Sequence, residues 1–243
     1  MSKKVLWSAV LLLSSGLCVT NANAYLVSID QFTITKNGNP FWNDDFNALP
    51  SAADYVINGT VGPIAGGKLI LDSSNGPEIF GGGSGNDLLR HRVLKKSSTQ
   101  PLPNTGGLKS DDTFTVKGIF DLFVPAVQNE FYGITLIDGV GGMPGNDNVQ
   151  IIVRRTLNDN LRIQFRAVDF IADTVTVLEQ VDLNPTGGDQ ISLMLSRTSS
   201  TGPISASFAY GTGGIFGAAT NFTATQSIFN GEDFTRAQFQ ALT

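Results

Sequence analysis

One stretch of the chain, from Phe131 to Phe170, limits the possible folds more than any other. Its sequence is FYGITLIDGVGGMPGNDNVQIIVRRTLNDNLRIQFRAVDF, and apolar and polar residues alternate in three parts of it. A loop rich in Gly, Asn and Asp at 138–148 and a tight turn at 158–160 separate these parts. A period of two places one set of side chains in a core and the other set on the opposite face of a sheet. The stretch therefore predicts three antiparallel strands with one buried face.

The same alternation recurs elsewhere, in segments bounded by Gly, Pro or Asn, which is typical of strands. A change of parity at Asp30-Gln31 predicts a bulge or a bend, and a second change near Gly118 predicts a kink. The segments lie at 25–35, 112–124, 174–183, 190–195 and 203–210. Together they predict an all-β protein, namely a two-sheet antiparallel β-sandwich.

The last segment, 230–242, predicts a different structure. Glu232 and Asp233 stand near its start, behind Asn230 as a candidate cap. Acidic residues in a first turn after a capping residue are typical of a helix N-terminus. We therefore expect a short C-terminal helix beside the sandwich.

Part of the N-terminal half resembles a known superfamily. The segment FWNDDF at 41–46 precedes an irregular polar stretch, a short strand at 55–57 and then GGKLIL at 66–71. This order resembles the opening of concanavalin A-like lectin/glucanase domains. The resemblance extends to the general strand order of much of the chain. It implies a jelly-roll sandwich in which this early segment pairs with the end of the chain.

The first 24 residues have the pattern of a signal peptide. Lys3 and Lys4 form a basic start, an apolar run follows from Val5 to Leu13, and Ala22-Asn23-Ala24 is a cleavage pattern. The apolar run is shorter than the roughly 20 residues that span a bilayer. We therefore expect cleavage after Ala24 and export, either secreted or periplasmic, with residues 25–243 forming a single β-sandwich domain.

The expected mature chain contains no cysteine, because Cys18 is the only one in the sequence. An exported domain without disulfides must be held by its core or by bound ions. The whole chain has 16 Lys and Arg; without Lys3 and Lys4, 14 remain against 21 Asp and Glu, a net charge of −7. This acidic balance argues against a nucleic-acid partner, which usually needs a basic face.

Residue counts argue against several kinds of active site. Retaining glucanases of this fold carry two Glu and an Asp on one strand, because acid and nucleophile must flank one glycosidic bond. The only histidine, His91, lies between two arginines, and no G-x-S-x-G motif is present. The mature chain has four glutamates, no two of them close in sequence: Glu78, Glu130, Glu179 and Glu232. The sequence thus favours a non-catalytic protein and leaves a catalytic pair formed across strands open.

A polar row on the predicted sheet is the first candidate site. If the turn at 158–160 closes a hairpin, Arg154 and Arg162 are neighbours on one face. Like charges opposite each other are unfavourable, so we expect compensation from Glu179, from Asp182 or from an anionic ligand such as an acidic glycan. The alternative is a solvated face with internal ion pairs. The row comprises Gln150, Arg154, Arg162, Gln164 and Arg166.

The loop after the first of the three strands is the second candidate site. Calcium takes six to eight oxygen ligands, and Asp and Asn side chains supply them. The same residue types also form ordinary turns, so an ion-free turn is the alternative. The candidate ligands are Asp138, Asn146, Asp147 and Asn148. Calcium is the only cofactor that the sequence suggests.

Three functions remain open at this point. The leading one is an exported, non-catalytic, lectin-like domain that binds carbohydrate or another surface component. The second is a polysaccharide hydrolase or lyase with a cross-strand site. The third is a structural or adhesive protein of the envelope or matrix. Fold alone does not decide between them.

Overall fold

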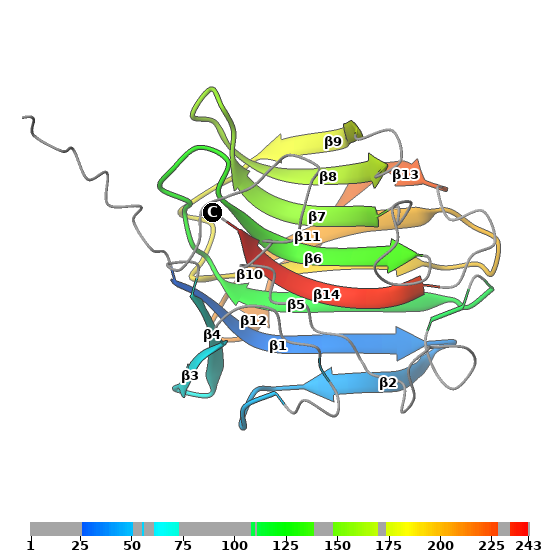
Figure 1. Ribbon diagram of the computed structural model, residues 1–243, viewed down its shortest axis with the longest axis horizontal. Helices are drawn as coiled ribbons and strands as arrows, with labels where there is room; N and C mark the ends of the chain where they lie inside the picture. The colour runs from blue at the N-terminus through cyan, green and yellow to red at the C-terminus, as the bar shows by residue number, and fades with distance from the viewer. Residues whose placement is uncertain are drawn as a thin grey trace, which may run out of the picture.

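A computed structural model describes residues 26–50, 55, 61–72, 108–109, 111–138, 148–169, 174–227 and 234–242. In these ranges the chain forms strands and turns, arranged as two antiparallel sheets packed face to face (Figure 1). The predicted all-β sandwich is confirmed. The described ranges contain no helix, and hence none long and apolar enough to cross a membrane.

The larger sheet has nine strands, in the order β12-β11-β10-β5-β1-β4-β3, with β13 paired to β11 and β2 paired to β1. These strands come from both halves of the chain. Their bounds are β1 Leu26–Lys36, β2 Asn39–Asp44, β3 Val61–Ala65, β4 Lys68–Asp72, β5 Phe114–Asp121, β10 Gln190–Arg197, β11 Ile204–Thr212, β12 Ile215–Phe216 and β13 Thr220–Gln226.

The smaller sheet has five strands, in the order β14-β6-β7-β8-β9. Four of them follow one another in the sequence, so the meander predicted from the alternation at 131–170 is confirmed and continues into β9. The bounds are β6 Phe131–Asp138, β7 Asn148–Arg155, β8 Leu161–Asp169, β9 Thr174–Asp182 and β14 Phe234–Leu242.

The predicted bulge in the first strand is confirmed. The register between β1 and β5 shifts between Ile29 and Gln31, so Asp30 is the additional residue. The irregularity expected at Gly118 belongs to this same bulge, because Ile119 and Phe120 are the residues opposite it. The strand that contains Gly118, β5, pairs with β10 in one continuous register over its whole length.

Two expectations about the C-terminus are wrong. The segment expected to form a helix contains strand β14, which pairs with β6, and none of the described residues of the early segment pairs with β14. Instead β1 and the chain just after β2 meet β14 across the core, where the Phe239 ring lies 5.3 Å from that of Phe32 and 5.5 Å from that of Phe46. Pairing with β6 outweighs the local capping signals, as tertiary context often outweighs propensity.

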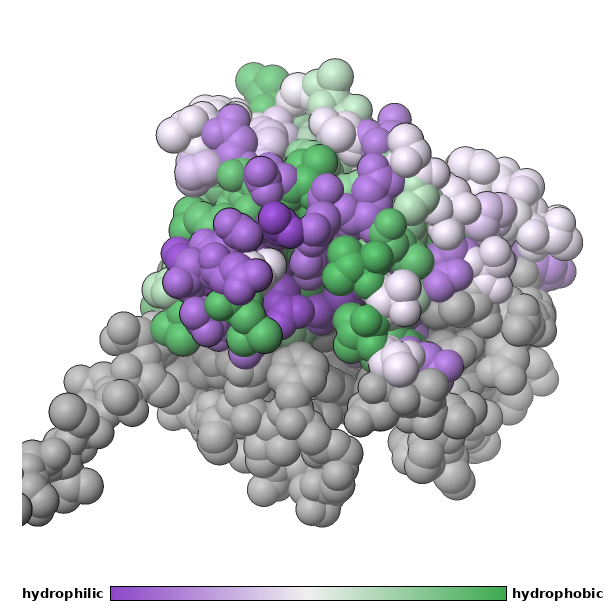
Figure 2. All heavy atoms as spheres, turned by 90° about the horizontal axis from the view of Figure 1, so that it is seen from above, coloured by the Kyte–Doolittle hydropathy of each residue, from purple (hydrophilic) through white to green (hydrophobic). Residues whose placement is uncertain are grey.

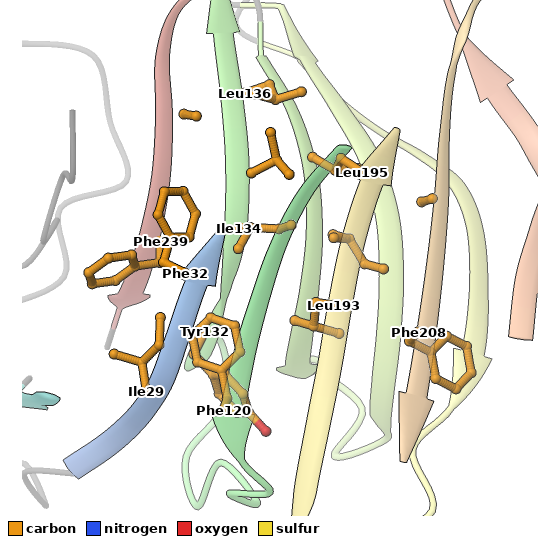
Figure 3. Packing of buried hydrophobic residues seen from close by; sticks show 14 of the residues in the cluster. Ile29, Phe32, Phe120, Tyr132, Ile134, Leu136, Leu193, Leu195, Phe208 and Phe239 are labelled. Carbon is orange, nitrogen blue, oxygen red and sulfur yellow. The ribbon is translucent and has the colours of Figure 1, made fainter. Parts of the chain in front are cut away.

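The core fills the space between the two sheets. Figure 3 shows the inward side chains of β6, such as Ile134 and Leu136, facing those of β5 and β10. Within this part of the core, the Tyr132 hydroxyl donates to the Phe123 carbonyl at 2.9 Å and accepts from the Phe123 amide at 3.2 Å. Burial raises the pKa of Tyr132 above its ordinary value. The phenol therefore stays neutral and fixes the segment that follows β5.

One carboxylate, that of Glu179, connects the two sheets at the edge where β9 and β13 meet. The Glu179 carboxylate accepts from the Thr223 amide at 2.7 Å, the Thr223 hydroxyl at 3.0 Å and the Ala224 amide at 2.7 Å. These amides are available because β13 bulges where its register with β11 shifts, between Ser205 and Ser207. Glu179 thus links the five-stranded sheet to the nine-stranded sheet.

Candidate binding face

The residues of the predicted polar row share one face of the five-stranded sheet. Along β7 and β8 they alternate with core residues such as Ile151 and Phe165, so they point away from the nine-stranded sheet. We call this side the outer face. Across it Gln150 pairs with Arg166, and Arg154 pairs with Arg162. The expectation that Arg154 and Arg162 are neighbours on one face is confirmed.

The polar row extends further than the sequence indicated. Thr135 on β6 is the cross-strand partner of Gln150, and Gln238 on β14 is the partner of Thr135. Four polar side chains therefore lie side by side across four strands: Gln238, Thr135, Gln150 and Arg166. The alternation in β6 could have revealed Thr135, whereas Gln238 lies in the segment expected to be helical.

Burial divides the outer face into two zones. Arg166 is only 2% exposed, Gln164 is 4% exposed and Gln150 is 6% exposed. The polar row is therefore not solvated along its whole length, because Arg166 is buried. Its Nε donates to the Gln150 side-chain oxygen at 2.5 Å, and its guanidinium carbon lies 4.5 Å from the centre of the Phe131 ring. Such contacts satisfy a guanidinium inside the protein.

The second zone is partly exposed and contains both like charges. Arg154 Nη2 donates to the Asn129 side-chain oxygen at 2.7 Å, and Arg162 Nε lies 3.3 Å from an Asp182 carboxylate oxygen. Asp182 is thus one of the two predicted counter-charges. The other candidate, Glu179, binds β13 instead.

Several acceptor atoms on the outer face have no hydrogen-bond partner among the described residues. They are the Thr135 hydroxyl oxygen and the side-chain oxygens of Asn148 and Gln164. Gln164 does donate through Nε2 to the Gln180 side-chain oxygen at 3.0 Å, so only its acceptor side is open. A buried acceptor without a donor is unfavourable.

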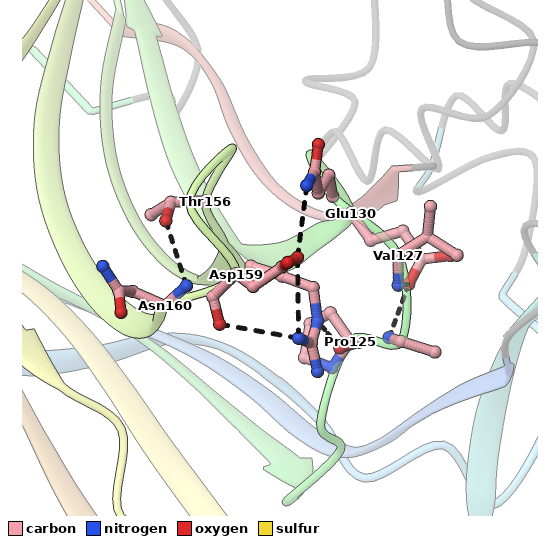
Figure 4. Close-up of polar contacts among 9 residues, drawn as sticks. Pro125, Val127, Glu130, Thr156, Asp159 and Asn160 are labelled. Carbon is pink, nitrogen blue, oxygen red and sulfur yellow. Dashed lines mark hydrogen bonds and ion pairs between the residues drawn. The ribbon is translucent and has the colours of Figure 1, made fainter.

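Hydrogen bonds between turns support the exposed end of the outer face (Figure 4). The Glu130 carboxylate accepts from the amides of Ala126 at 2.8 Å and Val127 at 2.9 Å. Arg155 Nε donates to the Pro125 carbonyl at 2.7 Å, and the Asn160 amide donates to the Thr156 hydroxyl at 3.2 Å. These bonds fix the segment before β6 to the β7–β8 turn. They hold the Arg154 end of the face in place.

The candidate calcium loop is described only at its two ends. Asp138 ends β6, Asn148 begins β7, and Ile137 pairs with Asn148, so the two strand ends converge as a hairpin requires. The other two candidate ligands, Asn146 and Asp147, lie outside the described residues, as does the side chain of Asp138. Among the described residues, no group of three His, Cys, Asp or Glu side chains is close enough to bind a metal.

A second charged cluster lies on the nine-stranded sheet, where sequence reasoning did not anticipate it. Lys68 Nζ lies 3.3 Å from an Asp30 oxygen and 2.5 Å from an Asp121 oxygen. Gln190 Nε2 donates to the other Asp30 oxygen. Burial raises the pKa of Asp30 above its ordinary value, against the opposing effect of the Lys68 charge. The bulge in β1 brings Asp30 to this position, which local alternation cannot reveal.

The segment that carries the resemblance forms a compact turn. The Phe46 amide donates to Asp44 Oδ1 at 2.9 Å, the Tyr55 hydroxyl donates to Asp44 Oδ2, and Trp42 Nε1 donates to the Tyr55 oxygen at 3.0 Å. Phe46 has a φ of 52°, which is rare for a large residue. Asp44 therefore stabilises an unusual backbone that directs the Phe46 ring into the core.

Comparisons with known proteins found no relative of this chain. No family model matches the chain, and neither a curated protein nor a solved structure is significantly similar to it. The two-sheet antiparallel sandwich is compatible with a jelly roll.

Proposed function

We propose that this chain is an exported, non-catalytic, lectin-like β-sandwich of the concanavalin A-like type that binds acidic glycan or a similar surface component. The ligand would contact the exposed zone of the outer face, around Arg154 and Arg162. The buried zone, with Gln164 and Arg166, would support these residues from below. The resemblance of the FWNDDF and GGKLIL segments favours a jelly-roll lectin.

The observation that carries the proposal is the Arg154–Arg162 pair. Two guanidinium groups that lie opposite each other across strands repel one another, and an anion bound between them would reduce this repulsion. Guanidinium groups bind carboxylates and sulfates through paired N–H donors. The neighbouring amide of Gln180, which is oriented by Gln164, supplies the hydroxyl-binding groups that a sugar needs.

A glycan array with point variants tests this function. The unsubstituted protein should bind uronate- or sulfate-containing glycans, and Arg154→Gln with Arg162→Gln should reduce the signal at least tenfold. Lys117→Gln is the matched control, because it removes a positive charge on the opposite, nine-stranded sheet. Melting temperatures of all variants show whether folding is intact. A protein that binds no glycan on the array would support the structural or adhesive alternative.

The second candidate function is a polysaccharide hydrolase that uses the Asp30, Lys68 and Asp121 cluster. The specific observation is that both carboxylates contact one ammonium group while burial raises the pKa of Asp30. Two carboxyl groups in different environments are the arrangement that glycoside hydrolysis uses. Release of reducing ends from polysaccharides that Asp30→Asn abolishes, without a loss of melting temperature, would favour this function.

Export has its own test. The basic start, the apolar run and Ala22-Asn23-Ala24 predict cleavage before Tyr25. Mass spectrometry of the protein from its native host should find Tyr25 at the N-terminus, outside the cytoplasm. An intact Met1 in the cytoplasmic fraction would contradict export and the extracellular ligand together.

A further inference from the structure

The five-stranded sheet is buried on both of its faces, although described strands cover only one of them. Its inner face packs against the nine-stranded sheet. On its outer face, Thr135 of β6 and Ile152 of β7 are nevertheless 0% exposed, and Gln238 of β14 is 1% exposed. In a sandwich of two antiparallel sheets the outer faces normally stay solvated. The outer face therefore has a cover other than the described strands.

The covered area begins at β14 and ends before β9. Arg166 of β8 is 2% exposed, whereas Val177 of β9, its cross-strand partner on the same face, is 42% exposed. Figure 2 looks down on the β9 side of the molecule and shows hydrophobic side chains interspersed with hydrophilic ones. The solvent side of the nine-stranded sheet has no comparable cover, because Thr33, Lys117 and Met194 there are all partly exposed.

The longest stretch outside the described ranges, residues 73–107, joins opposite ends of the sandwich. At its start, Asp72 pairs with the first residue of β1. At its end, the Asp112 carboxylate accepts from the Lys109 amide at 2.7 Å and lies 2.8 Å from Nζ of Lys36, the last residue of β1. β1 has 11 residues, so the two ends are about 33 Å apart. Residues 73–107, which we call the crossing segment, therefore run the length of the molecule.

The route of the crossing segment is limited by what already fills the molecule. Core side chains occupy the space between the sheets, and the solvent side of the nine-stranded sheet is partly exposed. The outer face lies close to β1, because the Phe239 ring of β14 is 5.3 Å from the Phe32 ring. After residue 25, no other stretch outside the described ranges is longer than residues 139–147, which join adjacent ends of β6 and β7.

The composition of the crossing segment suits the outer face. The buried part of that face includes apolar Phe131, Ile137 and Ile152 among its polar groups. Removing apolar side chains of both partners from water is favourable. The crossing segment contains three adjacent apolar pairs, namely Ile79-Phe80, Leu88-Leu89 and Val93-Leu94.

We propose that the crossing segment packs across β14, β6, β7 and β8 as a third layer of the fold. This layer leaves β9 and the Arg154–Arg162 end of the outer face open. A ligand of the outer face then reaches it only in these open parts. The proposal concerns packing within the chain and does not depend on glycan binding.

Thiol reactivity toward a maleimide tests whether the outer face is covered. All variants carry Cys18→Ser, which removes the only native cysteine. Thr135→Cys places a thiol on the covered face, where the Thr135 hydroxyl has no hydrogen bond among the described residues to lose. Thr33→Cys is the matched control on the solvent side of the nine-stranded sheet. The thiol at position 135 should react at least tenfold more slowly than the thiol at position 33.

Replacing the six paired apolar residues of the crossing segment by serine tests whether this segment is the cover. The substitutions keep the length of the chain. They should raise the reactivity at position 135 at least tenfold and leave that at position 33 unchanged. Ala206→Cys, at a core residue that is 2% exposed, reports on folding and should stay unreactive with either form of the segment.

Disulfide formation is a second measurement, made with the apolar pairs otherwise intact, that stands even if the serine variant does not fold. Thr135→Cys should form an intramolecular disulfide under mild oxidation with at least one of Ile79→Cys, Leu88→Cys and Val93→Cys, whereas Thr33→Cys should form none. A thiol at position 135 that reacts as fast as that at position 33 overturns the proposal. So does protection at position 135 that the six serines leave intact in a folded protein, or the absence of all three disulfides.

Discussion

Gly133 shows how closely one residue can constrain the sheet. Its φ is 157°, and a Cβ at this position would lie 2.2 Å from the Ile151 carbonyl oxygen of β7. Backbone cannot yield as a flexible side chain can, so any side chain here would push β6 and β7 apart.

We expect Gly133→Ala to lower the free energy of unfolding by about 3 kcal/mol, near the upper end of common single substitutions. Gly217→Ala is the control, because its nearest neighbour would be the Tyr210 carbonyl oxygen at 3.7 Å, an ordinary contact. Urea unfolding followed by tryptophan fluorescence measures both. Equal effects of the two substitutions would contradict the close approach of β6 and β7.

Glu179 makes the stability of the β9–β13 edge depend on pH. Hydrogen bonds from the Ala224 and Thr223 amides and from the Thr223 hydroxyl lower the pKa of Glu179 below its ordinary value of 4.5. A carboxyl group with a lower pKa in the folded state stabilises the fold above its unfolded pKa, and this contribution disappears as pH falls through the folded pKa.

The melting temperature of the unsubstituted protein should therefore exceed that of Glu179→Gln at neutral pH. The difference should persist down to about pH 4.5 and then shrink as the carboxylate is protonated. Thermal melts at a series of pH values measure it. A constant difference across the acidic range would show that charge on Glu179 does not hold the two sheets together.

At the scale of elements, the loop between β6 and β7 is where the calcium prediction can be tested. The strand ends at Asp138 and Asn148 converge, which brings the chain on both sides of the loop together. An ion that binds only the folded protein adds about 2.7 kcal/mol at a hundredfold excess over Kd.

The melting temperature should rise with added calcium and fall with a chelator, and Asp138→Asn with Asp147→Asn should abolish the response. Asp159→Asn, in the β7–β8 turn at the opposite end of β7 from this loop, is the matched control and should leave the response intact. Melting curves that are indifferent to both calcium and chelator would leave the loop as an ordinary turn.

Elements with a local signal were predictable from sequence, and those made by distant contacts were not. The meander of β6, β7 and β8 was predictable because alternation and turn residues lie within one stretch. Strand β14 was not, because its pairing with β6 connects residues about 100 positions apart while its local signals favour a helix. The chain therefore has the expected class of fold with a different C-terminal element.

In the candidate site, too, the features with a local sequence signal were predictable and those made by distant contacts were not. The Arg154–Arg162 neighbour relation was predictable because a tight hairpin fixes it. The burial of Arg166 was not, since it depends on Phe131 from another strand. The Lys68 cluster joins four strands, β1, β4, β5 and β10, and no local pattern marks it.

At the scale of the whole molecule, the sandwich separates structural polar groups from those available to a ligand. On the nine-stranded sheet Lys68 contacts both Asp30 and Asp121, and at the β9–β13 edge the Glu179 carboxylate accepts hydrogen bonds from amides. On the outer face of the five-stranded sheet, the partly exposed guanidinium groups of Arg154 and Arg162 lie opposite each other. This arrangement makes binding of an anionic ligand the central claim about the molecule.

The most direct test compares one acidic glycan with the same glycan after reduction of its carboxyl groups, by calorimetric titration at low and high salt. The acidic form should bind, the reduced form should bind at least tenfold more weakly, and salt should weaken only the acidic form, because it screens the interaction between charges. Arg154→Gln with Arg162→Gln should remove this difference. Equal binding of both forms, independent of salt and of these arginines, would contradict the proposed binding face.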